Sequence, residues 1–182
     1  NFGIYDMNST STGNEVHDNF IHIQDAYNNV IGLAANNVNI HNNTIMIGSD
    51  SNSSSSNSNY GIMGTNNIIH HNIISLESNS NSYAIENTYN IFTYTNMSIY
   101  DNQIELIGGA SGIRGDRLNI YDNTMSGDGA TAIKINGDEG QEIEIYNNIL
   151  VGSISIHDET TAHVHHNLIT TNNDGLEIAY NA

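Results

Sequence analysis

The sequence predicts an all-β protein folded as a parallel β-helix, in which the chain winds through a stack of equivalent coils. Three observations lead to this prediction: a repeat with a mean period of about 25 residues, short segments that alternate apolar and polar residues, and Asn-, Ser- and Gly-rich stretches between them. Strands this short cannot bury an apolar face alone. Stacked coils can, because each strand pairs with its equivalents above and below.

The repeat is clearest in a four-residue motif: a β-branched residue, His or Tyr, then Asp, Asn or His, and finally Asn. An apolar residue follows two positions after each Asn. We expect the β-branched residues Ile40, Ile69, Ile99, Ile120, Ile145 and Val164 to point inward along one sheet. The motif Asn residues, 19 to 30 positions apart, are Asn19, Asn43, Asn72, Asn102, Asn123, Asn148 and Asn167.

A second apolar series runs between the motifs with the same mean spacing and usually stands beside Gly, Ala or Ser. Its members are Ile4, Leu33, Ile62, Ile85, Ile113, Ile133, Ile154 and Leu176. Each repeat therefore holds at least two strands, and the chain should form about seven to eight coils. The polar segments 49–59 and 77–82 are expected to bulge from the coil wall as loops.

Length and charge limit the classes of protein that are possible. The 182 residues predict one solenoid domain over 1–182, and the absence of Cys excludes disulfides and thiolate metal sites. Three basic residues against 20 acidic ones give a net charge of -17, which excludes nucleic acid and anionic membranes as partners. The sequence contains no apolar run long enough for membrane insertion.

The repeated pattern resembles the parallel β-helix repeats of the pectin-lyase-like superfamily. This resemblance implies a right-handed, single-stranded β-helix with an Asn ladder, formed by the seven motif Asn residues, in a tight turn between two sheets. The Asn-, Ile- and Tyr-rich composition, as in segment 67–74, also resembles β-helix regions of adhesin-like surface proteins of methanogenic archaea and bacteria. That second likeness implies an extracellular or cell-surface location.

The seven Asn side chains could in principle bind a sugar or a metal ion. We instead assign them to stability, because stacked turn Asn side chains bond exposed backbone groups and one another.

The second motif position should form a row of outward-facing rings at the inter-strand spacing of about 4.8 Å. One interpretation is cross-strand stacking that stabilises an exposed sheet. The other is a sugar-binding platform of Tyr100, Tyr121 and Tyr146, with hydrogen bonds from Asp101 and Asp122. The row consists of His17, His41, His70, Tyr100, Tyr121, Tyr146 and His165.

Histidines also suggest metal sites. His163 and His165 share one face of a predicted strand, and His41 and His70 should lie on adjacent coils, but neither pair has an evident third ligand. The acidic loops lack calcium-binding spacings, so we expect Ca²⁺ to bind only diffusely, as a counter-ion.

Enzymes of the superfamily act on acidic polysaccharides, usually through basic residues. The candidates here are Arg114, Asp116, Arg117 and Lys134, of which Arg114 and Lys134 each follow an Ile of the second series and should align. The alternative is an ion pair on the coil wall. The Arg-x-Pro-x-x-Arg, Asn-Thr-Asp and Gly-His-Gly motifs of the family's enzymes are missing.

The sequence thus favours a non-catalytic extracellular module: a surface stalk, an adhesin or a filament-forming subunit that can bind glycans on its wall. Because strands of the second series stand near both ends, we expect an excerpt of a longer β-helix or an open-ended unit that stacks end to end with copies of itself. The alternative is a carbohydrate-active enzyme, a polysaccharide lyase or hydrolase, or a phage-type spike domain.

Overall fold

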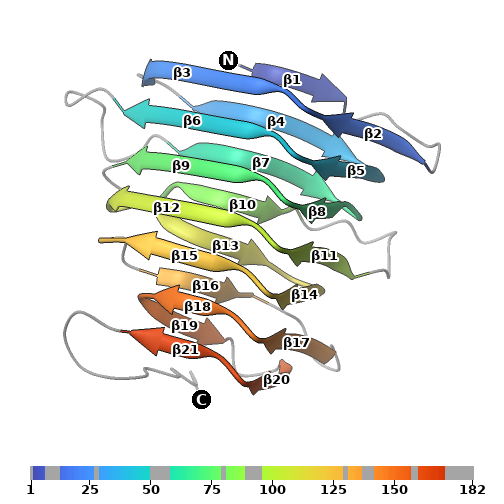
Figure 1. The fold of residues 1–182 in the computed structure, drawn as a ribbon, viewed down its shortest axis with the longest axis vertical. Coiled ribbons are helices and arrows are strands. Elements are labelled where there is room, and N and C mark those ends of the chain that lie inside the picture. Colours follow the sequence, from blue (N-terminus) through green and yellow to red (C-terminus); the bar gives the residue numbers. More distant parts are fainter. Residues whose placement is uncertain are drawn as a thin grey trace.

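The computed structural model describes residues 2–6, 13–26, 29–49, 58–78, 81–88, 96–128, 131–136, 142–156 and 160–170. Within these ranges the chain forms β-strands and no helix, so no helix of the described part could cross a membrane. The strands pair in parallel and build three sheets of seven strands each, through which the chain winds in constant order (Figure 1). This architecture confirms the predicted parallel β-helix.

We number the sheets by their order within a coil. Sheet 1 contains β1 (Phe2–Asp6), β4 (Val30–Asn36), β7 (Asn59–Thr65), β10 (Tyr83–Asn87), β13 (Ser111–Gly115), β16 (Thr131–Ile135) and β19 (Ser153–Ile156). Sheet 2 contains β2 (Asn14–His17), β5 (Val38–His41), β8 (Ile68–His70), β11 (Met97–Tyr100), β14 (Leu118–Tyr121), β17 (Glu142–Tyr146) and β20 (Thr161–His165). Sheet 3 contains β3 (Phe20–Ala26), β6 (Thr44–Ser49), β9 (Ile73–Ser78), β12 (Gln103–Gly108), β15 (Thr124–Gly127), β18 (Ile149–Val151) and β21 (Leu168–Thr170).

Each sheet contributes one stack of apolar side chains to a single core. In sheet 2 the stack is the predicted row from Ile40 to Val164, in register and fully buried from Ile40 to Ile145. The second apolar series forms the stack of sheet 1, from Ile4 to Ile154. The apolar residues after each Asn, Ile21 to Ile169, form that of sheet 3.

Each repeat therefore contains three strands, one in each sheet, where the sequence predicts at least two. Leu176 of the second series lies outside the described residues, as do positions 50–57 and 79–80 of the two expected loops.

Small residues before the sheet 1 stack are explained by close packing against the backbone of the next coil in sheet 1 and against side chains of sheet 3. A Cβ atom on Gly61 would lie 2.5 Å from the carbonyl oxygen of Ala84 and 2.9 Å from Cγ2 of Ile74. Because such distances are far inside van der Waals contact, this position requires a small residue.

A two-residue turn joins sheet 2 to sheet 3 in every coil, and its second residue is the ladder Asn. The first residue has the left-handed conformation, with φ between 54° and 56°, a region that Asn, Asp and His tolerate best. The left-handed backbone conformation therefore belongs to the residue before the ladder Asn, not to the ladder Asn itself. The left-handed residues are Asp18, Asn42, His71, Asp101, Asp122, Asn147 and His166.

The ladder Asn side chains hydrogen-bond from coil to coil. The backbone N–H and the Nδ2 of each Asn donate to Oδ1 of the next one at 2.9–3.1 Å, from Asn19 through to Asn167. Each Nδ2 beyond the first coil also donates to two backbone carbonyls, as Asn72 does to Ile40 and His70. The amides are therefore occupied within the protein, which supports a stabilising role.

Candidate functional site

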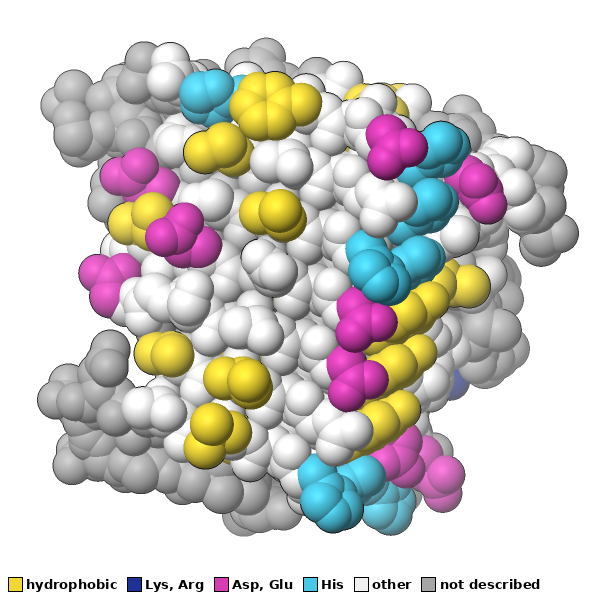
Figure 2. Space-filling view, viewed as in Figure 1, with side chains coloured by type: hydrophobic (Ala, Val, Ile, Leu, Met, Phe, Trp, Pro, Cys, Tyr) yellow, Lys and Arg dark blue, Asp and Glu magenta, His cyan; other side chains and the backbone are white. Residues whose placement is uncertain are grey.

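The rings of the second motif position form one continuous stack on sheet 2, which we call the ring ladder. Neighbouring centroids are 4.9–5.3 Å apart and the ring planes differ by only 4–8°. Figure 2 shows histidines continuing into tyrosines along one side of the molecule. The predicted row of rings is therefore present, and its members are His17, His41, His70, Tyr100, Tyr121, Tyr146 and His165.

Stacking determines which atoms of the ladder a ligand could reach. The faces of Tyr100, Tyr121 and Tyr146 lie against neighbouring rings, so the ladder presents ring edges and hydroxyl groups. Asp101 and Asp122 stand exposed in the adjoining turns. Burial raises the pKa of Tyr121, and the neighbouring tyrosines raise it further, so its hydroxyl stays a neutral donor. A sugar here would meet hydroxyls and carboxylates rather than open ring faces.

Two ladder histidines are held by neighbouring turn histidines. The Nδ1 atoms of His70 and His71 are 2.7 Å apart, as are those of His165 and His166. Nε2 of His70 also contacts Oδ1 of Asn39 at 3.0 Å. Burial lowers the pKa of His70, and positive charge on His71 or His41 would lower it further, so the neutral ring is favoured.

The candidate metal pairs are not gathered around a common point. An ion bound to imidazole nitrogen lies in the ring plane, and the planes of His41 and His70 are almost parallel with centroids 5.1 Å apart. His163 and His165 both lie exposed on β20, where Nε2 of His165 is 3.4 Å from Oε2 of Glu144. In the described part of the chain, no three His, Asp or Glu side chains are grouped to hold a metal ion.

The basic candidates separate into two places. Arg114 and Lys134 are register partners on β13 and β16, as predicted, while Asp116 and Arg117 lie in the turn after β13. Arg114 pairs across coils with Glu86, Nη1 to Oε1 at 3.4 Å, and lies 4.9 Å above the Tyr83 ring. Burial raises the pKa of Glu86, and Arg114 partly offsets this rise. Glu86 follows Ile85 of the second series and is the register partner of Arg114, so the spacing that aligns Arg114 with Lys134 also identifies Glu86.

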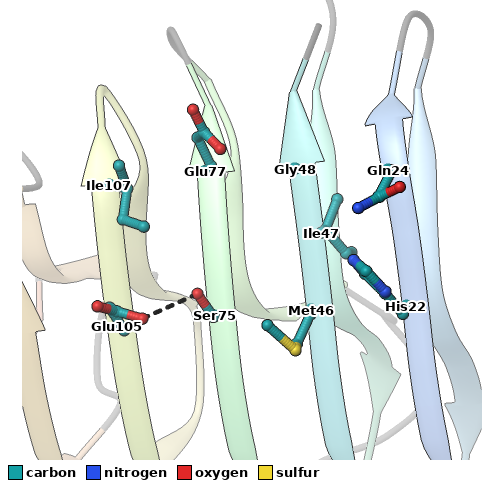
Figure 3. A pocket seen from close by; sticks show the side chains of 9 residues that line it. All are labelled: His22, Gln24, Met46, Ile47, Gly48, Ser75, Glu77, Glu105 and Ile107. Atoms are coloured by element: carbon teal, nitrogen blue, oxygen red, sulfur yellow. Dashed lines mark hydrogen bonds between the residues drawn. The ribbon is translucent and has the colours of Figure 1, made fainter.

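A groove on the outer face of sheet 3 was also missed, because its residues belong to no repeated motif. It has a volume of about 490 Å³ and crosses β3, β6, β9 and β12 (Figure 3). Ser75 donates to Glu105 at 3.0 Å on its floor. An adjoining hollow of about 340 Å³ shares Ser75 and Glu105 and extends to β15. The groove is lined by His22, Gln24, Met46, Ile47, Gly48, Ser75, Glu77, Glu105 and Ile107.

Three parallel seven-stranded sheets, with an Asn ladder at one corner, place the chain in the class of parallel β-helix solenoids. Comparisons of the chain with models of known protein families, with curated proteins and with solved structures find no match.

Proposed function

We propose that the protein is a non-catalytic structural β-helix module, serving as a stalk, adhesin or filament-forming subunit at a cell surface or in the extracellular space. The observation that carries this proposal is the continuity of the core through three seven-stranded sheets, with an unbroken ring ladder on sheet 2 and an unbroken Asn ladder in the turn that follows it. Such a stack resists bending, because every coil is bonded to the next.

The Asn-bearing turn also supports kinship with the pectin-lyase-like superfamily and with adhesin-like surface proteins. Both likenesses rest on the repeated motif and its place between two sheets. An extracellular location follows from the second likeness.

End-to-end partners are supported by the direction of the Asn ladder. Each Asn donates to the Asn that follows it, so a copy placed beyond β21 could accept from Asn167 through its own Asn19. The same geometry suits a longer β-helix. A net charge of -17 opposes contact at low ionic strength, so assembly should strengthen as salt or diffusely bound Ca²⁺ screens the charge.

Sedimentation across a salt series from about 0.01 M to about 1 M tests the proposed assembly. We expect species that lengthen as the salt concentration rises, and filaments visible by electron microscopy. A chain that remains monomeric throughout would contradict self-assembly and leave the longer β-helix as the remaining form of the proposal.

Glycan binding on the ring ladder is part of the same proposal. Hydroxyls of Tyr100, Tyr121 and Tyr146, with the carboxylates of Asp101 and Asp122, offer a repeated row of donors and acceptors. The replacement Asp122→Asn tests this role by removing one charge while retaining a side chain suited to the left-handed turn.

A carbohydrate-active enzyme or phage-type spike is the second candidate, favoured by one observation. Glu86 is a largely buried carboxyl whose pKa is raised, and it lies beside Arg114 and, one coil on, Lys134. Raised carboxyl pKa values are typical of general acids. Activity screening on neutral and acidic glycans distinguishes the candidates: turnover lost in Glu86→Gln or Arg117→Ala would overturn the non-catalytic proposal.

A further inference from the structure

The groove on sheet 3 runs across the strands, along the direction in which the coils stack. In Figure 3 its side chains come from four successive strands, from His22 on β3 to Ile107 on β12. The adjoining hollow continues the same path to Thr124 and Ser126 on β15. An occupant of both would be elongated and would meet an equivalent strand at each coil.

Gly48 helps to keep the groove open, although the fold does not require glycine there. A Cβ atom at this position would meet only the Glu77 carboxylate, at 3.7 Å, and the backbone lacks the left-handed φ that favours glycine. Gly61, by contrast, is required by contacts of 2.5 Å and 2.9 Å. Glycine inside a strand often marks a bulge or a place that a ligand approaches closely; Gly48 lies beside the register shift between Ile23 and Ala26 of β3, and it also leaves the space above the groove open.

The lining suits a ligand rich in hydroxyl groups. Amides of Gln24 and Gln103 and the hydroxyl of Ser126 both donate and accept hydrogen bonds, while the carboxylates of Glu77 and Glu105 accept them. Apolar surface lies between these groups, contributed by Met46, Ile73 and Ile107. This mixture matches the hydroxyls and C–H faces of sugar rings.

Charge restricts the class of sugar. Two carboxylates line the groove, and neither Lys nor Arg does so among the residues that the structure describes. A polyanionic glycan would be repelled, since the whole chain also carries a charge of -17. A peptide strand would not pair within the groove, because the groove lies on the face of the sheet and β6, β9 and β12 are each hydrogen-bonded on both sides; only β3, at the end of the sheet, has one neighbour.

We infer that this groove binds a neutral, extended oligosaccharide, lying along the stacking direction of the coils. The site is distinct from the ring ladder and goes beyond the proposed structural role. Its volume of about 490 Å³ falls within the range of ligand sites, and the adjoining hollow lengthens it.

Calorimetry with neutral gluco-, manno-, xylo- and chito-oligosaccharides of increasing length provides the test. We expect one of these series to bind, with an affinity that rises with chain length and changes little with salt. Gly48→Ile should fill the groove and weaken binding at least about tenfold, without lowering the melting temperature. Ser155→Ile, a similar change on the outer wall of sheet 1, is the matched control and should bind as the parent does.

Three results would overturn the inference: no binding of any neutral oligosaccharide, binding that Gly48→Ile leaves unchanged, or binding that Ser155→Ile abolishes equally. The other possible occupant is a basic peptide, which is tested by measuring the binding of a lysine oligomer at low and high salt. Tight, salt-sensitive binding of that oligomer, lost in Gly48→Ile, would assign the groove to basic peptides instead. Sedimentation of Gly48→Ile separates the two proposals, because assembly should be unaffected whether or not the groove binds sugar.

Discussion

Nδ2 of Asn102 donates to Oδ1 of Asn123 at 3.0 Å, although the two residues are 21 positions apart. Both side chains are 1% exposed, so this bond joins two coils inside the protein. Buried polar groups are costly when unpaired, and the ladder satisfies them with one residue type repeated at one position.

Asn102→Ala should be strongly destabilising. It removes the acceptor for the backbone N–H and Nδ2 of Asn72 and the donor to the carbonyls of Ile69 and Tyr100. We expect a loss of about 3 kcal/mol or more, from several unsatisfied groups at about 1–3 kcal/mol each. Urea denaturation measures it, with the exposed neighbour Gln103→Ala as control. Equal stability of the two variants would contradict the role given to the ladder.

Ile120→Asn tests the core, with Ile149→Asn as its matched control. Ile120 is fully buried in sheet 2, whereas Ile149 is 49% exposed on sheet 3. The core change loses apolar burial and leaves an amide without an assured partner, at a total of about 3 kcal/mol or more. Thermal denaturation should show a large drop for Ile120→Asn and a small one for Ile149→Asn; similar melting temperatures would refute the core assignment.

Tyr121→Ala interrupts the ring ladder at its centre. The ring stacks on Tyr100 at 4.9 Å and on Tyr146 at 5.0 Å. Two aromatic pairs at about 0.5–1.5 kcal/mol each predict a loss of about 1–3 kcal/mol, in addition to lost burial. Near-ultraviolet circular dichroism should lose the coupled tyrosine signal as stability falls. Tyr5→Ala, at a side chain outside the ladder, should leave that signal intact.

Acidification should destabilise the ladder through His70. Its pKa is lowered in the folded protein from the ordinary 6.5, chiefly by burial, so the unfolded chain binds a proton more readily. Stability is therefore complete above pH 6.5 and declines as the pH falls from there towards the lowered value. Denaturation between neutral and mildly acidic pH should show this decline, and His70→Gln should reduce it more than the exposed His163→Gln. An equal slope in both variants would refute the assignment.

Asp122→Val tests the left-handed turn position, where φ is 56°. A β-branched residue is strained in this conformation and should cost about 1–2 kcal/mol, whereas Asp122→Gly adopts it freely. Chemical denaturation compares the two variants. If the Asp122→Val variant were as stable as the Asp122→Gly variant, backbone conformation would not explain why Asp, Asn and His occupy this position.

Features repeated in every coil could be predicted from the sequence. The inward rows through Ile69 and Ile62, the Asn ladder and the order of rings along the ring ladder all recur with the coil period. Each is determined by the residue's place within its own coil. Stacking then brings equivalent positions together without further information.

Contacts between non-equivalent residues depended on the tertiary structure. Repeats of 19 to 30 residues differ in the length of their connections, so only the assembled structure shows that Nε2 of His70 contacts Asn39 or that Gly48 opens a groove. The left-handed residue before each ladder Asn likewise emerges from the corner between sheets 2 and 3. Local periodicity determines what repeats along the chain, whereas the path of each connection determines which unlike side chains become neighbours.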